Sequence, residues 1–183
     1  MDPSQGTTPS QFLTFTLDQE RYAVEIAKVR EVLEFTSVNR VPRTPDFMRG
    51  VINLRGNVVP VIDLRLKLGL SPTERTLDSC VIITEVLADG EPVVLGALAD
   101  SVQEVIELDP ASILPPPRMG TRVDTAFIRG MGRRDDQFLI ILDIDRVLSD
   151  DDLHAVIAAP SSAPSSAPPA AAPPAGNETA PQA

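Results

Sequence analysis

The chain has 183 residues, 43% of them hydrophobic, and its 16 basic and 26 acidic side chains give a formal net charge of −10. This length suits one ordinary domain or two small ones, and the acidic balance argues against a general nucleic-acid-binding protein, which needs a basic surface. No apolar run approaches the roughly 18 residues of a membrane span, and the first residues lack the charged and apolar regions of a secretory signal. We therefore expect a cytoplasmic protein with no direct membrane insertion and no nucleic-acid partner.

The first half of the chain is predicted to consist mainly of short strands. Residues 1–10 are short and polar and are expected to be disordered, whereas residues 12–17 (FLTFTL) alternate apolar side chains with Thr, as half-buried strands do. The polar residues 18–20 then supply a turn. Thr44-Pro45 fits a helix N-cap followed by Pro at the first helical position, which predicts a short helical turn. Pro60 cannot donate to a ladder, so its strand is expected to be an edge strand or to carry a bulge.

The second half continues the β pattern and ends in a helix. Residues 78–87 are rich in β-formers, and Asp89-Gly90 is a strong hairpin signal before the next apolar run. Ser149 with Asp152 resembles a capping box, which predicts a helix over residues 149–159. Residues 160–183 are almost entirely Pro, Ala and Ser, so they cannot bury enough surface to offset their ordering entropy and are expected to form a disordered tail.

A two-fold internal repeat is the most informative feature of the sequence. Residues 22–35 align without gaps to residues 95–108, and residues 47–68 align without gaps to residues 127–148. Positions that recur unchanged are Val29 and Val102, Glu31 and Glu104, Val32 and Val105, Phe47 and Phe127, and Asp63 and Asp143. A single repeat of this size predicts two copies of one supersecondary unit, each too small to be stable without the other.

The strands and the repeat together predict a mainly β fold made of two small β-barrels packed together. We expect the first barrel over residues 11–75 and the second over residues 76–148, with short helical turns and the final helix at residues 149–159.

Two Arg-Gly pairs differ in what they predict. Arg49-Gly50 recurs as Arg129-Gly130, so we expect both pairs to serve the fold, with the glycine meeting a backbone need at a bend. The pair Arg55-Gly56 does not recur, because the second copy has aspartates there. Arg55 precedes Asn57 at a probable turn, so its side chain is expected to be exposed without an evident structural role.

Few residues have the pattern of a catalytic or metal-binding site. The only histidine, His154, lies in the predicted last helix beside three aspartates, and Cys80 lies in an apolar strand where burial is the simpler interpretation. Asp63 and Asp143 occupy equivalent repeat positions and so should lie in separate barrels, where each is expected to cap the helical turn that follows it. The run 150–152 suits a helix N-terminus better than a Ca²⁺ loop. We expect no catalytic residue, no metal and no cofactor.

The valines of residues 28–32 and 101–105 are of a kind more often found in the core than on a contact surface. Because they recur in both copies, however, two adjacent barrels could bring them together to line a groove.

Several long motifs resemble the CheW family of bacterial chemotaxis coupling proteins over about residues 11–157. The resemblance rests on residues 12–34 (FLTFTLDQERYAVEIAKVREVLE), residues 41–70 (VPRTPDFMRGVINLRGNVVPVIDLRLKLGL) and residues 93–108 (VVLGALADSVQEVIEL). It implies two SH3-like five-stranded barrels with a hydrophobic groove between them. It also implies that the protein is not an enzyme but an adaptor, recruited to chemoreceptor arrays.

The same resemblance implies two partners and a set of contact residues. The partners would be the cytoplasmic tip of a methyl-accepting chemoreceptor and the regulatory domain of a chemotaxis histidine kinase, which shares the double-barrel fold. Receptor-binding residues would be Arg55, Val29, Glu31, Val32, Val102 and Val105, whereas Gly50, Gly56 and Gly130 would be structural turn residues. The alternative from a different class is a double-barrel nucleic-acid-binding module, which charge and composition disfavour, and an enzyme has the least support.

Overall fold

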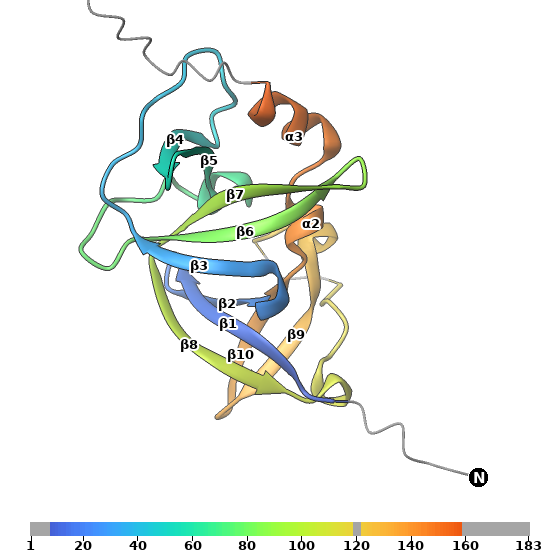
Figure 1. The fold of residues 1–183 in the computed structure, drawn as a ribbon. Helices are drawn as coiled ribbons and strands as arrows, with labels where there is room; N and C mark the ends of the chain where they lie inside the picture. The colour runs from blue at the N-terminus through green and yellow to red at the C-terminus, as the bar shows by residue number, and fades with distance from the viewer. Residues whose placement is uncertain (1–7, 119–121, 159–183) are drawn as a thin grey trace, which may run out of the picture.

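The computed structural model describes residues 8–118 and 122–158 (Figure 1). The tail at 160–183 and most of the N-terminal segment 1–10, both expected to be disordered, lie outside the described residues. Ser10, by contrast, already belongs to the first strand.

Ten strands form two five-stranded sheets that stack on one another (Figure 1). We call them barrel A and barrel B. In spatial order barrel A contains β8 (Ser101–Leu108), β1 (Ser10–Leu17), β2 (Glu20–Glu25), β10 (Gln137–Leu142) and β9 (Ile128–Arg134). Barrel B contains β3 (Val29–Glu34), β6 (Cys80–Ala88), β7 (Glu91–Ala99), β5 (Asn57–Asp63) and β4 (Met48–Leu54). The predicted mainly β fold of two five-stranded barrels is confirmed.

The barrels do not follow the division that we expected between residues 75 and 76. The first hairpin of each half pairs with the third strand of the other half, so β1 pairs with β8 and β3 pairs with β6. The chain crosses from one barrel to the other after β2, through the 3₁₀ turn η1 (Ile26–Lys28), and again between β7 and β8. A sequence repeat shows which strands are equivalent but not which copy each strand pairs with, and this is why the expected boundary fails.

The pairing registers confirm the alignment of the two copies. Val29 lies opposite Thr84 on β6, and its repeat equivalent Val102 lies opposite Phe15, which occupies the same place on β1. In the parallel pairs, Val61 lies opposite Gly96 and its equivalent Ile141 lies opposite Ala23. Each copy therefore uses the same strand geometry, but its first hairpin lies in one barrel with the last three strands of the other copy.

All four hairpins within the barrels turn over two residues with positive φ. This is the type I′ geometry, whose twist matches that of the strands it joins. The residue pairs, with their φ angles, are Asp18 (49°) and Gln19 (69°), Arg55 (51°) and Gly56 (85°), Asp89 (51°) and Gly90 (80°), and Asp135 (49°) and Asp136 (62°). The expected hairpin at Asp89-Gly90 is confirmed.

The hydrophobic core has three parts, because the central strands are buried on both faces. An inter-barrel core joins side chains of both barrels, such as Leu13 and Phe15 from β1 with Ile82 from β6. The interior of barrel A is filled around Phe12, and that of barrel B around Ile83. Successive residues of a strand point to opposite faces, so a single strand such as β1 contributes to two of these parts.

We expected Pro60 in an edge strand or at a bulge, but β5 sits between β4 and β7, and the irregularity in the β4–β5 pairing lies on β4 between Met48 and Gly50 rather than at Pro60. Its antiparallel partner Val51 directs both backbone groups to Asn39, away from β5. The recorded pairing with β7 begins only at Val61. The missing N–H of Pro60 therefore does not interrupt the pairing of β5 with β4 or with β7.

Two further local predictions are corrected. The segment after Thr44-Pro45 forms only a single turn, closed by the Met48 N–H donating to the Pro45 carbonyl (2.9 Å), and Thr44 donates to the Val41 carbonyl instead of capping a helix. Of the glycines expected in turns, only Gly56 lies in one. Gly50 and Gly130 lie within β4 and β9.

The glycines in β4 and β9 allow neighbouring backbone to approach closely. A Cβ at Gly50 would lie 2.3 Å from the Asn39 carbonyl oxygen, and one at Gly130 would lie 2.8 Å from that of Leu114. The repeated Arg-Gly pair thus serves the fold, as expected, through close backbone packing rather than through a turn.

Short helices complete the fold. These are α1 (Leu64–Lys67), α2 (Ile144–Val147) and α3 (Asp150–Ile157), with the 3₁₀ turns η2 (Pro110–Ser112) and η3 (Thr125–Phe127). The expected capping box between Ser149 and Asp152 is confirmed at the start of α3. Within the described ranges, no helix is long and apolar enough to cross a membrane.

Candidate partner-docking surface

Arg55 occupies the first turn position of the β4–β5 hairpin. Its φ of 51° is a conformation that Asn, Asp and Gly adopt more readily than a long side chain does. Its side chain is 74% exposed. The hairpin does not require arginine here, since Asp135 fills the equivalent position in the other copy with nearly the same backbone conformation.

The guanidinium of Arg55 is already bound within the chain. Nη1 and Nη2 donate to the two carboxylate oxygens of Glu31 on β3 at 2.8 and 2.9 Å. This bidentate geometry matches the planar fork of arginine. The hydrogen bonds from Arg55 to Glu31 raise the pKa of the guanidinium further above its ordinary value, so Arg55 stays charged.

The four valines of the predicted groove lie on one face, the face toward the inter-barrel core. Val29 and Val32 on β3 lie opposite Thr84 and Ile82, and Val102 and Val105 on β8 lie opposite Phe15 and Leu13. Val29 and Val102 are half-buried against the inter-barrel core. Val32 and Val105 lie further along β3 and β8, and they are 40% and 49% exposed. Each barrel therefore contributes one half-buried and one exposed valine.

Glu31 lies on the opposite face of β3 from these valines. Its cross-strand partner Ile83 belongs to the interior of barrel B, and directly opposed side chains share a face. The structure thus groups Glu31 with Arg55 rather than with the valines.

Arg49, the arginine that recurs in the second copy, has a structural role. Arg49 donates through Nη2 to the Thr73 carbonyl at 2.7 Å, and its Nε lies 3.8 Å from a carboxylate oxygen of Asp63. Arg129, its repeat equivalent, pairs with Glu25 at 2.7 Å. Arg49 thus holds the Thr73 segment and Arg129 joins β9 to β2, and both are less exposed than Arg55.

The carboxylates at repeat positions 63 and 143 do not form a catalytic pair. Asp63 is fully buried and accepts from the backbone N–H groups of Arg65 and Leu66, which confirms the expected cap of α1. Asp143 makes no side-chain cap bond to α2. Its expected capping role is therefore not present, and Asp143 instead lies 3.4 Å from Arg146.

The remaining candidates for chemistry have simple structural surroundings. His154 is exposed and its Nε2 lies 2.7 Å from a carboxylate oxygen of Asp89. Burial raises the pKa of the half-buried Cys80 thiol, which disfavours the reactive thiolate. Among the residues that the structure describes, no group of three or more metal-ligating side chains could hold an ion.

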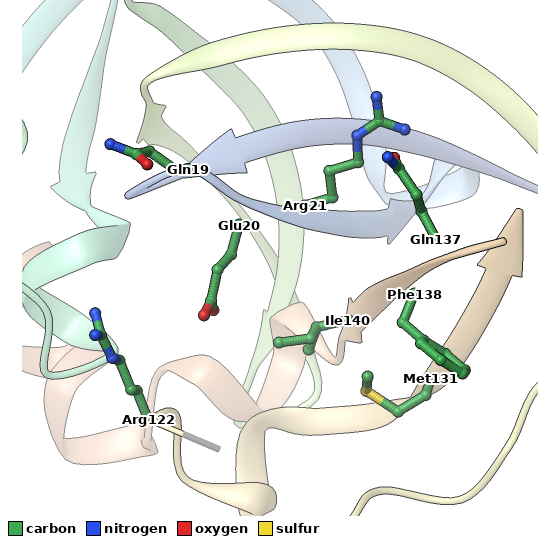
Figure 2. Close-up of a pocket in the computed structure, with 8 residues that line it drawn as sticks. All are labelled: Gln19, Glu20, Arg21, Arg122, Met131, Gln137, Phe138 and Ile140. Atoms are coloured by element: carbon green, nitrogen blue, oxygen red, sulfur yellow. The ribbon is translucent and has the colours of Figure 1, made fainter. Parts of the chain in front are cut away.

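A second open surface lies on barrel A, and it was missed from the sequence. A pocket of about 630 Å³ lies between β2, β9 and β10 and includes Phe138, Met131 and Ile140, with Arg21 and Arg122 also lining it (Figure 2). Phe138 is 57% exposed, which is unusual for so large an apolar side chain. Its place directly after the turn, at the start of β10, was the available signal, as its repeat equivalent Val58 at the start of β5 is also exposed.

Comparison with sequence families gives one match over most of the chain. A family model described as CheW-like domain matches residues 11–152. Chemotaxis protein CheW from Klebsiella aerogenes is 39% identical over 153 residues, which is 82% of this chain and 88% of that protein. The protein of the same name from Helicobacter pylori is 32% identical over 142 residues, 77% of this chain and 82% of that one.

A solved structure agrees with these relatives. The crystal structure of scaffolding protein TtCheW from Thermoanaerobacter tengcongensis matches with a TM-score of 0.70 at 38% identity, covering 79% of this chain and 95% of that one. Sequence and fold point the same way. The chain therefore belongs to the CheW-like domain family and is a chemotaxis scaffold or coupling protein.

Proposed function

We propose that this protein couples the cytoplasmic tips of chemoreceptors to a chemotaxis histidine kinase, with Arg55 as the anchor for the receptor. The observation that carries the proposal is the placing of Arg55. It is a highly exposed, always charged side chain at a turn position that the fold fills equally well with Asp135. An arginine of this kind is suited to several directed hydrogen bonds with carboxylate or carbonyl acceptors on a helix tip.

The exposed valines of β3 and β8 supply the apolar part of the same docking surface. Val32 and Val105 come from different barrels but face the same inter-barrel core. An amphipathic receptor helix laid against them would bury its apolar face, which is a common mode of helix recognition. Glu31 contributes by holding Arg55 rather than by lining this surface.

The kinase is proposed to dock on the other barrel, at the pocket around Phe138. An exposed aromatic beside Met131, with Arg21 and Arg122 nearby, suits a partner that presents an apolar side chain next to a carboxylate. The regulatory domain of the kinase, with the same double-barrel fold, is the proposed occupant. Because Arg55 and Phe138 lie on different barrels, one molecule can hold both partners at once in the cytoplasm, within a receptor array.

The decisive experiment compares two variants, each of which is expected to lose affinity for one partner and keep the other. Arg55→Ala is expected to lose at least about 30-fold in affinity for a receptor cytoplasmic fragment while binding the kinase regulatory domain normally. Phe138→Ala is expected to show the reverse pattern. Affinities for both partners are measured by titration calorimetry on each variant.

Arg146→Ala is the control, because Arg146 is an exposed arginine on α2 that pairs with the nearby Asp143 and belongs to neither proposed docking surface. It should leave both affinities unchanged. Since Arg55 is an exposed turn residue, its removal should shift the melting temperature by no more than about 2 °C. Equal loss of both partners in Arg55→Ala, or an unfolded variant, would show that Arg55 is structural and contradict the proposal.

The alternative of a nucleic-acid-binding module has no comparable support. The net charge of −10 opposes phosphate binding, and the exposed aromatic Phe138 lies in a pocket with Glu20 as well as its two arginines.

A further inference from the structure

The pocket around Phe138 presents hydrogen-bond donors that no other group in the described chain uses. Gln19, Arg21 and Gln137 line the pocket, and within residues 8–118 and 122–158 no side-chain hydrogen bond engages their donors. The carboxylate of Glu20, which also lines it, already accepts from the Tyr22 hydroxyl at 3.1 Å. Because glutamine and arginine side chains carry more donors than acceptors, the pocket suits a ligand that mainly accepts hydrogen bonds.

Apolar side chains form the rest of the same pocket. Phe138 is 57% exposed, and Met131 and Ile140 line the pocket with it. In the view of Figure 2 the Phe138 ring lies next to Met131, and Arg122 lies on the opposite side of the pocket. Proline-rich segments are bound by surfaces of this kind, because prolyl rings pack on an aromatic side chain. The carbonyls of such a segment accept hydrogen bonds, whereas the proline nitrogens have no hydrogen to donate.

The equivalent surface of barrel B lacks this chemistry. The repeat aligns Phe138 with Val58, so the exposed aromatic ring is absent there. It aligns Arg21 with Val94, so the free guanidinium is absent as well. The shared fold therefore does not require the ring and the donors, and their presence together is a property of barrel A alone.

A segment with matching chemistry belongs to this chain. Residues 163–175 (APSSAPPAAAPPA) contain five prolines and otherwise only Ala and Ser, a composition that favours the extended polyproline II conformation. Glu178 follows and is the only charged side chain of residues 159–183. Such a segment cannot build a core of its own, so any order that it gains must come from a surface that it binds. A proline-rich run followed by a carboxylate complements a pocket that combines an exposed ring with two arginines.

This segment is long enough to reach the pocket from the end of α3. The helix is held on barrel B, where its Asp152 lies 2.7 Å from Nζ of Lys67, in the turn of helix that directly follows β5. Glu178 is twenty residues beyond Ala158. In an extended conformation these residues span about 60 Å. A folded body of this size is roughly 40 Å across, so the segment can pass from barrel B to the pocket on barrel A.

We propose that the tail, residues 160–183, docks in the Phe138 pocket of its own chain, with a prolyl segment on the Phe138 ring and Glu178 toward Arg21 and Arg122. The docking does not depend on the proposed function, but its consequence rests on it. The tail occupies the site proposed for the kinase regulatory domain, so that domain must displace it. Because the tail and the pocket share one chain, the tail acts at an effective concentration on the order of millimolar, and even weak contacts keep the pocket partly occupied.

Reciprocal NMR shifts in the full-length protein test the docking. Phe138→Ala changes only the pocket and is expected to move the amide signals of Gly176 and Glu178. Glu178→Lys lies outside both barrels and is expected to move the amide signals of Gln137 and Phe138. The amide signal of Val58, the equivalent of Phe138 on barrel B, should stay in place in Glu178→Lys.

Glu91→Lys is the control, because it reverses the charge of an exposed glutamate at the start of β7 on barrel B. It should leave the signals of Gln137 and Phe138 in place. Unmoved signals in either of the two reciprocal variants, or equal movement at Val58, would overturn the docking. Shifts that disappear on dilution would show that the tail of a second copy occupies the pocket, which would also contradict the proposal.

Titration of the kinase regulatory domain into the full-length variants tests the competition. Glu178→Lys is expected to raise the affinity of that domain by about two- to fivefold, because a weak tethered competitor is lost, whereas Glu91→Lys should not change it. If Phe138→Ala weakens binding of the domain but Glu178→Lys leaves its affinity unchanged, the competition is wrong. If the domain binds wild type and Phe138→Ala equally, the proposed kinase site fails, while the docking of the tail is still decided by the reciprocal shifts.

Discussion

The two copies of the repeat have the same backbone arrangement, but the aspartate at one repeat position has different surroundings in each copy. Asp63 ends β5 and Asp143 directly follows β10, and the backbone N–H of each donates to the carbonyl of Phe47 or Phe127 in the same way. Asp63 is fully buried and bound by several donors, whereas the Asp143 side chain is 30% exposed and caps nothing. Strand register is thus a property of the repeat, while the buried polar contacts are a property of one barrel.

Replacing each aspartate with alanine should give the largest difference in stability between the two copies. Asp63→Ala would leave four donors without their acceptor, namely the N–H groups of Arg65, Leu66 and Thr73 and the Thr73 hydroxyl. Because buried unpaired donors are costly, we expect a loss of about 4 kcal/mol in the free energy of unfolding. Asp143→Ala should cost no more than about 1 kcal/mol. Urea denaturation of both variants measures the difference, and similar losses would show that the two sites are equivalent after all.

The paired glycines of β4 and β9 give a smaller contrast. A Cβ at Gly50 would meet only backbone atoms, the nearest at 2.3 Å, and the φ of 148° disfavours any side chain. At Gly130 the nearest atom, at 2.6 Å, is the end of the Ile113 side chain, which can shift, and the Leu114 carbonyl oxygen is less close, at 2.8 Å. We expect Gly50→Ala to cost about 3 kcal/mol and Gly130→Ala about 1–2 kcal/mol. Thermal unfolding of the two variants gives the order, and a larger loss at Gly130 would contradict it.

The smallest expected effect concerns Lys67, whose repeat equivalent is the buried Val147. Lys67 Nζ lies 2.7 Å from a carboxylate oxygen of Asp152 and above the ring of Phe47. Burial raises the pKa of Asp152, but the hydrogen bonds from Lys67 and Ser149 outweigh it and hold that pKa below the ordinary value of 3.8. The resulting stability is present above pH 3.8 and is lost as the pH falls through the lower folded value.

Lys67→Met should therefore bring the pKa of Asp152 upward and reduce this acid-dependent part of the stability, by less than about 1 kcal/mol. NMR titration of the Asp152 carboxyl group, with melting curves between about pH 2 and 6, measures both effects. An unchanged pKa in the variant would show that Ser149 alone is responsible.

The sequence was sufficient for the strands, the hairpin at Asp89-Gly90, the final helix and the equivalence of Val29 with Val102. These features depend on local periodicity, turn chemistry and capping, which short stretches of sequence contain. It also distinguished the structural Arg49 from the exposed Arg55, because repetition indicates a shared structural need.

Other features depend on partners that are distant in the chain and were not predictable. The place of Pro60 in an interior strand depends on where pairing with β7 begins. The separation of Glu31 from the valines follows from the irregular register between Val29 and Glu31, which changes the face that each residue occupies. Alternation alone, counted along the strand, cannot reveal such a shift.

The exchange of first hairpins between the copies has a consequence for synthesis of the chain. β1 is complete near the N-terminus, yet Thr14 bonds to Glu104, a residue 90 positions later. Barrel A also needs β9 and β10, which are the last of the ten strands in chain order. Contacts so distant in sequence slow folding, because loop closure must precede the contacts that reward it.

A ribosome-bound chain that ends before β8 should therefore hold barrel B nearly complete and barrel A as a lone β1–β2 hairpin, since β3 to β7 have all emerged by then. An isolated hairpin is marginal in water. Barrel B is thus the part of the protein that can form first during translation, and it can offer its partly exposed apolar face to the β1–β2 hairpin as the first surface on which barrel A is built.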